Sequence, residues 1–192
     1  MSPIRSRRRR WLLYVAPMVL VGLVVALVFF EPWKLVVDDV VDEALPTVSS
    51  TAPTTPATAR AGTPAPAPPT TEAATVLAEG SLISHEHETS GTVRVLRLGD
   101  GSRVLRLEDL DTSNGPDLKV WVTDAPVIEG RDGWFVFDDG EYVDLGDLRG
   151  NRGSQNYPLP AEVDLAELSS VSIWCARFRV SFGAAELTPV AA

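Results

Sequence analysis

The sequence predicts an all-β fold: an antiparallel, β-sandwich-like extracytoplasmic domain, preceded by one transmembrane helix and a disordered Pro/Thr-rich stalk. Three observations predict it. A charge-free run follows a cluster of arginines, the next segment is rich in Pro, Thr and Ala, and the C-terminal part alternates β-branched and aromatic runs with turn residues. The predicted parts are a cytoplasmic basic tail (1–10), the transmembrane helix (11–30), a juxtamembrane segment (31–45), the linker (46–75) and the β domain (76–190).

Charge is distributed unevenly along the chain, whose formal net charge is −9. Five arginines lie within the first ten residues, and no Asp or Glu precedes Glu31. The rest of the chain carries all 26 acidic residues against 12 basic ones. An acidic body repels phosphate backbones, so nucleic acid is not expected as a partner of the domain.

Residues 11–30 carry no charge and are long enough to cross a hydrocarbon core of about 30 Å as a helix. Trp11, Tyr14 and Trp33 lie near the two ends, where aromatic rings prefer the membrane interface. A cleaved signal peptide is the alternative, but it would have a shorter apolar region and a small-residue cleavage site. The positive-inside rule then predicts a single-pass protein of the plasma membrane with its N-terminus in the cytoplasm and its C-terminal domain outside.

Two segments separate the apolar run from the β domain. Residues 34–45 mix apolar pairs with acids, and they would form either a short juxtamembrane helix or the start of the linker. Residues 46–75 have almost no large apolar side chains, so burial cannot offset the entropy of ordering them. Because Pro-rich chain extends by about 3.1 Å per residue, we expect a spacer of up to about 90 Å.

The β domain is predicted from short runs of strand-forming residues. Residues 92–98 and 102–107 flank Gly99-Asp100-Gly101, and Asp-Gly between two such runs predicts a hairpin. Four further strands are predicted, at 118–123, 133–137, 142–145 and 171–182, and the last is the longest. A helical turn is predicted only at 161–168. Many short strands at this spacing are typical of an antiparallel sandwich or barrel.

Cys175 is the only cysteine, so an intramolecular disulfide is excluded. If residues 171–182 form one strand, alternation gives the core face to Trp174, Ala176, Phe178, Val180 and Phe182. Cys175 would then lie on the opposite face beside Arg177, whose guanidinium would lower the pKa of the thiol. The alternative is a buried, inert cysteine, because free cysteine is among the most buried residue types.

His85 and His87 would share a face on a strand and could hold one metal ion, with Cys175 completing a copper-like set. No methionine follows Met18, so an axial copper ligand of that type is missing, and the flanking glutamates indicate a solvated turn. We therefore expect no metal and no other cofactor.

Other known site patterns are weak or absent. Residues 109–115 resemble a calcium loop, but Val120 occupies the position that needs a bidentate Glu. No nucleophile elbow, Walker loop or dinucleotide fingerprint occurs. A nucleophilic pair of Cys175 and His87 would lack an identified third group to orient the histidine.

Four sequence segments occur in order across residues 79–187. They are His87-Glu88-Thr89-Ser90-Gly91, Asn114-Gly115-Pro116-Asp117-Leu118-Lys119-Val120-Trp121, residues 144–150 running on to Gly153, Gln155, Tyr157 and Pro160, and Ile173-Trp174-Cys175-Ala176-Arg177-Phe178 with Phe182-Gly183-Ala184. Together, in this order, they resemble the DM-thirteen domain family. The resemblance implies a small extracytoplasmic β domain, of a kind that often accompanies DOMON and membrane cytochrome domains. It also implies an electron-transfer role for the motif cysteine, Cys175, supported by the motif residues His87, Gly91, Asn114, Gly115, Pro116, Asp117, Trp174 and Arg177.

Two functions follow from these observations. The first is a membrane-anchored module associated with electron transfer through Cys175, acting with a membrane redox protein. It would be an accessory module rather than a self-sufficient enzyme, because a lone thiol cannot close its own disulfide. The second is a non-catalytic module that binds a component of the cell envelope. Thiol reactivity separates them, since only the first requires an accessible Cys175.

Overall fold

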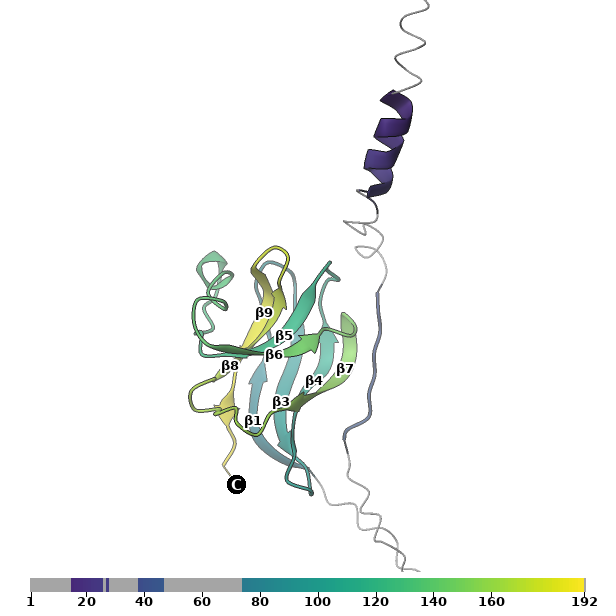
Figure 1. The fold of residues 1–192 in the computed structure, drawn as a ribbon. Helices are drawn as coiled ribbons and strands as arrows, with labels where there is room; N and C mark the ends of the chain where they lie inside the picture. Colours follow the sequence, from purple (N-terminus) through teal and green to yellow (C-terminus); the bar gives the residue numbers. More distant parts are fainter. Residues whose placement is uncertain (1–14, 26, 28–37, 47–73, 192) are drawn as a thin grey trace, which may run out of the picture.

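The computed structural model describes residues 15–25, 27, 38–46 and 74–191. Two five-stranded antiparallel sheets pack face to face (Figure 1), with the strand orders β10-β1-β3-β4-β7 and β2-β9-β8-β5-β6. The predicted antiparallel, sandwich-like β fold is therefore confirmed.

The first sheet is built around the predicted hairpin. Its strands are β1 (Thr75–Ser81), β3 (Ser90–Arg97), β4 (Arg103–Asp111), β7 (Arg152–Leu159) and β10 (Thr188–Pro189). Gly101 has a φ of 85° and so adopts the left-handed conformation that this turn needs. The Asp100 carboxylate also accepts a hydrogen bond from the Ser102 N–H (2.9 Å), which fixes the turn between β3 and β4.

The second sheet contains β2 (Ile83–Ser84), β5 (Leu118–Thr123), β6 (Tyr142–Asp147), β8 (Ser170–Cys175) and β9 (Val180–Glu186). The strands predicted at 118–123 and 142–145 are confirmed as β5 and β6. A single helical turn closes within the 161–168 region, where the Leu168 N–H donates to the Asp164 carbonyl (2.8 Å).

Two predicted strands are wrong. Gly133 ends a short 3-10 helix, η2 (Arg131–Gly133), and residues 134–137 lie in the irregular turns that follow it, where backbone hydrogen bonds close locally. Residues 171–182 are not one strand but two, β8 and β9, joined by a turn at 176–179. That turn contains no Gly, Pro, Asn or Asp, which are the residues that usually mark a turn, so its pattern resembled continuous strand.

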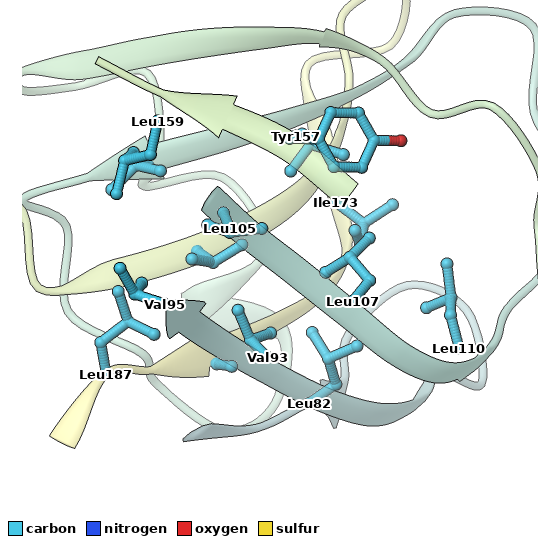
Figure 2. Packing of buried hydrophobic residues seen from close by; sticks show 14 of the residues in the cluster. Leu82, Val93, Val95, Leu105, Leu107, Leu110, Tyr157, Leu159, Ile173 and Leu187 are labelled. Atoms are coloured by element: carbon cyan, nitrogen blue, oxygen red, sulfur yellow. The ribbon is translucent and has the colours of Figure 1, made fainter. Parts of the chain in front are cut away.

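The main core lies between the two sheets (Figure 2). Val93, Leu105 and Leu107 from the first sheet meet Ile173 from the second, and all four are fully buried. The outer face of the second sheet is also covered, because Trp121, Phe137, Trp174, Ala125 and Ala184 form a separate cluster there. Each face of this sheet therefore carries a buried apolar cluster.

The N-terminal part is described only in pieces. Residues 15–25 and 27 of the predicted membrane span are helical, and no helix in the described part of the chain has both the length and the apolar character needed to cross a membrane. The tail 1–10, residues 31–37 and the linker from 47 to 73 lie outside the described residues.

Residues 38–46 are extended rather than helical, and they run beside β7 (Figure 1). Val40 pairs in parallel with Arg152, and the Val41 N–H donates to the Arg152 carbonyl (2.9 Å). We call residues 38–46 the strap.

Candidate functional site

Three of the four motif segments meet where β8 ends. Leu118 of β5 pairs with Cys175, and the Ala176 N–H donates to the Asp117 carbonyl (2.9 Å). The Leu148 N–H donates in turn to the Leu118 carbonyl (2.8 Å). Segments that are far apart in the sequence therefore form one end of the sandwich.

The fourth segment attaches to the same region through β9. The His87 ring lies 3.9 Å from the Phe182 ring, centroid to centroid, and Thr89 Oγ1 donates to the Phe182 carbonyl (2.9 Å). Phe182 also lies against Gly115, where an added Cβ would be 3.0 Å from its ring. Gly91, with a φ of 132°, lies at the bulge between β3 and β4, where an added Cβ would be 2.9 Å from the Glu108 carbonyl oxygen.

Cys175 is the last residue of β8, and none of its surface is exposed. Burial raises the pKa of its thiol, and the Asp117 carboxylate acts in the same direction. The backbone N–H groups of Phe178 and Arg177 approach the sulfur and oppose this shift without reversing it. The thiol is therefore neutral at neutral pH.

The prediction of a solvent-facing, low-pKa Cys175 is wrong. Because β8 ends at Cys175, the following turn carries Arg177 into solvent and leaves the sulfur in the core. The predicted core face also divides: Trp174 is buried in the outer cluster, whereas Phe178 is exposed. A buried cysteine, the alternative left open by the sequence, is what the structure has.

A row of stacked aromatic rings leads from the surface to the residue before Cys175. We call Tyr142, Trp121 and Trp174 the aromatic row. The Tyr142 and Trp121 rings are 3.9 Å apart with an interplanar angle of 10°, and the Trp121 and Trp174 rings are 5.2 Å apart at 25°. Tyr142 is 45% exposed, whereas both tryptophans are buried.

Sequence reasoning missed the aromatic row. Trp121 is directly opposite Ser172, not Trp174, in the antiparallel ladder between β5 and β8. The two indoles meet diagonally on the outer face of the sheet. Only the register of β5 against β8 brings them together.

A polar cleft of about 320 Å³ lies at the end of the sandwich where Leu118 pairs with Cys175. Its lining contains the whole Asn114-Gly115-Pro116-Asp117 motif, together with Lys119, Arg149 and Asp39 of the strap. Lys119 forms ion pairs with Asp147 and with Asp117 (3.4 Å), and the hydrogen bond to Asp147 is the main cause of the raised pKa of Lys119. The cleft therefore combines fixed cations and carboxylates.

The two histidines do not converge on one point. Nδ1 of buried His85 lies 2.9 Å from Ser181 Oγ, and burial lowers the pKa of His85. The His87 ring instead packs against the Phe182 ring at a tilted angle of 44°, and it pairs with the Glu86 carboxylate. Residues 85–87 form a bend, but the predicted solvated turn is wrong for His85, which is buried. Within the ranges that the structure describes, no group of three or more His, Cys, Asp or Glu side chains is arranged to hold a metal ion.

Comparison with known proteins places this geometry in a family. The family described as "Electron transfer DM13" matches residues 81–187. Searches of curated proteins and of solved structures each found no match. The matched region contains β2 to β9, the motif segments and Cys175, and it is more than half of the chain. The chain belongs to the DM13 electron-transfer family.

Proposed function

We propose that the chain is a membrane-anchored electron-transfer module in which Cys175 exchanges single electrons with a partner through the aromatic row. The observation that carries this proposal is the unbroken stacking from half-exposed Tyr142 to Trp174, the residue bonded to Cys175. Tyrosine, tryptophan and cysteine are the side chains that lose one electron most readily, and here they adjoin one another.

Burial decides which redox chemistry suits the thiol. Nucleophilic thiol chemistry needs an accessible thiolate, and Cys175 is neutral and fully buried. A one-electron step needs no contact between the sulfur and the partner, because the electron can pass through the rings between them. The buried position therefore favours a relay over a disulfide-forming thiol.

The proposed step balances as follows. A strong one-electron oxidant at Tyr142, such as a high-valent haem of a membrane protein, takes an electron that is replaced through Trp121 and Trp174 from Cys175. The thiol loses one electron and its proton and becomes a sulfur radical. The proposed proton acceptor is the Asp117 carboxylate, which belongs to the residue next to Leu118, the β5 partner of Cys175. Reduction of the radical by one electron and return of the proton restore the thiol.

Membrane anchoring is the second part of the proposal. It is supported by the arginine cluster that precedes the charge-free run of residues 11–30. An anchor of this kind would keep the domain beside a partner in the same membrane.

Flash photolysis with a soluble ruthenium photo-oxidant tests the relay on the full chain in detergent. In the wild-type protein, a tryptophan radical should form and then decay as Cys175 reduces it. Cys175→Ala should prolong that radical several-fold, and Trp121→Phe should reduce the yield of oxidised Cys175. Trp134→Phe is the matched control, because Trp134 lies outside the aromatic row.

Identical radical lifetimes in the wild-type protein and Cys175→Ala would exclude the relay. The function would then be the non-catalytic one, a module that binds an envelope component. The polar cleft of about 320 Å³, lined by the Asn114–Asp117 motif, is the surface that favours this second function.

A further inference from the structure

The edge of the first sheet at β7 is occupied by the strap. β7 is an end strand of its sheet, and an end strand presents unpaired N–H and C=O groups. The Val41 N–H donates to the Arg152 carbonyl (2.9 Å), the Glu43 N–H to the Ser154 carbonyl (2.8 Å), and the Arg152 N–H to the Asp39 carbonyl (3.3 Å). These bonds add the strap to the sheet as a parallel edge segment.

Side chains of the domain bind the C-terminal half of the strap. Nη1 of Arg106, a residue that is only 7% exposed, donates to the carbonyl oxygens of Glu43 (3.0 Å) and Ala44 (3.3 Å). The Glu43 carboxylate pairs with Arg149 and accepts from the Asn156 N–H (2.8 Å). Asn156 Nδ2 also donates to the Ala44 carbonyl (3.0 Å).

The N-terminal half of the strap is held by Asn151, which is 2% exposed. Asn151 Oδ1 accepts from the Asp39 N–H (2.7 Å), and Nδ2 donates to the Asp38 carboxylate (3.0 Å). Arg152 lies 3.3 Å from the same carboxylate. The site therefore recognises both the extended backbone of the strap and its acidic side chains.

Two glycines of the domain leave room for the backbone of the strap. A Cβ on Gly153 would collide with the Val41 carbonyl, and one on Gly150 would collide with the Asp39 carbonyl and lie 2.9 Å from Val41 Cγ2. Gly150 does not have a positive φ, and the three nearest atoms to its added Cβ all belong to the strap. The domain's own packing therefore gives no reason for glycine at position 150.

We propose that the β7 edge is a docking site for an extended acidic peptide, and that residues 38–45 of the same chain fill it. The strap lies outside residues 81–187, so the site belongs to the family domain and the occupant to an appended segment. With the strap docked, residues 38–46 and β1 are both hydrogen-bonded within the first sheet, the strap at β7 and β1 at β3. The docked strap also places Asp39 in the wall of the motif cleft. Release of the strap would remove Asp39 from that wall and open the cleft on this side.

Hydrogen exchange of the full chain in detergent, read by mass spectrometry, tests docking directly. The amides of Val41 and Glu43 should be protected, and Gly150→Ala should speed exchange of the 38–46 peptide by about tenfold or more. Exchange of the β8–β9 peptide should not change. An unprotected strap in the wild-type chain, or equal protection in Gly150→Ala, would overturn the proposal.

A double-variant comparison separates docking from an internal role of Gly150. When residues 38–45 are replaced by a Gly/Ser sequence of equal length, Gly150→Ala should no longer lower the melting temperature. If it lowers the melting temperature as much as in the wild-type chain, the glycine serves the domain itself and the proposal fails.

A labelled synthetic peptide of residues 38–45 tests recognition of the occupant. It should bind the strap-replaced chain saturably, and bind both the wild-type chain and the strap-replaced Gly150→Ala variant about tenfold more weakly or worse. Equal binding to all three, or none to the strap-replaced chain, would contradict a specific site. Strap protection that disappears on dilution would assign the occupant to a second copy and overturn docking within one chain.

Discussion

Trp174 and Cys175 are consecutive residues of β8 that lie in different apolar clusters on opposite faces of one sheet. Trp174 packs against Trp121 on the outer face of the second sheet, whereas Cys175 lies on its inner face, between the two sheets. One peptide unit therefore connects the core thiol to the aromatic row. This relationship underlies the proposed relay, and it also explains why the thiol is shielded from solvent.

Burial predicts slow chemistry at Cys175. Iodoacetamide should alkylate the thiol of the folded domain on the order of a hundredfold more slowly than that of the unfolded chain, because attack needs local opening. The pH at which the rate is half-maximal should also lie above the ordinary value for cysteine, because burial raises the pKa. Mass spectrometry of the single cysteine measures both. Equal rates in the folded and unfolded states would contradict the buried position.

Core truncation should be far more damaging than a change on the turn. Leu107→Ala removes a fully buried side chain and should lower the free energy of unfolding by about 2–5 kcal/mol. Phe178→Ala is the control on an exposed site and should change it by no more than about 0.5 kcal/mol. Urea unfolding followed by tryptophan fluorescence gives both values. A large loss at Phe178 would show that the turn packs on something in solution.

Acid should destabilise the domain through His85. Burial lowers the pKa of His85 in the folded state, so the unfolded chain, with a pKa near 6.5, takes up the proton first. The stabilising contribution is fully present above pH 6.5 and is lost as the pH falls below that value. Unfolding free energies from pH 8 to 5 should show this loss, and His85→Asn should remove it. An unchanged slope in that variant would assign the effect to other groups.

The strap should undock at a lower pH than the pH at which His85 titrates. Although burial opposes the shift, hydrogen bonds from Asn156 and Arg149 lower the pKa of Glu43 below its ordinary value of 4.5. Docking is therefore favoured above pH 4.5 and weakens as the pH falls through the depressed value. Hydrogen exchange of the 38–46 peptide across this range, corrected for intrinsic rates, measures the effect. Glu43→Gln should show weaker docking at neutral pH and a smaller change in this window.

Topology can be tested in intact cells. Protease added to spheroplasts should digest the β domain and spare an epitope tag placed in the first ten residues, because the arginine cluster is expected to remain inside. Lysed spheroplasts should lose both signals, which provides the control. Protection of the β domain in intact spheroplasts would reverse the proposed orientation.

The sequence by itself determined the local features of the β domain. The β3–β4 hairpin was predictable because Asp100 and Gly101 form a turn between runs of strand-forming residues. β5 was predictable because its residues alternate and its ends carry turn signals. The ordered motifs around Asn114 and Cys175 were sufficient to suggest the family, which the match to residues 81–187 confirmed.

Tertiary structure alone decided the orientation of Cys175, the aromatic row and the position of the strap. The turn at 176–179 lacks the usual turn residues, so only the pairing of β8 with β9 shows that the strand ends at Cys175 and that its side chain faces the core. Trp121 and Trp174 meet because of the register between β5 and β8. Glu43 and Arg149 are paired across more than a hundred residues of chain. Periodicity describes which side of its own element a residue occupies, but contacts between distant segments depend on how those elements pack.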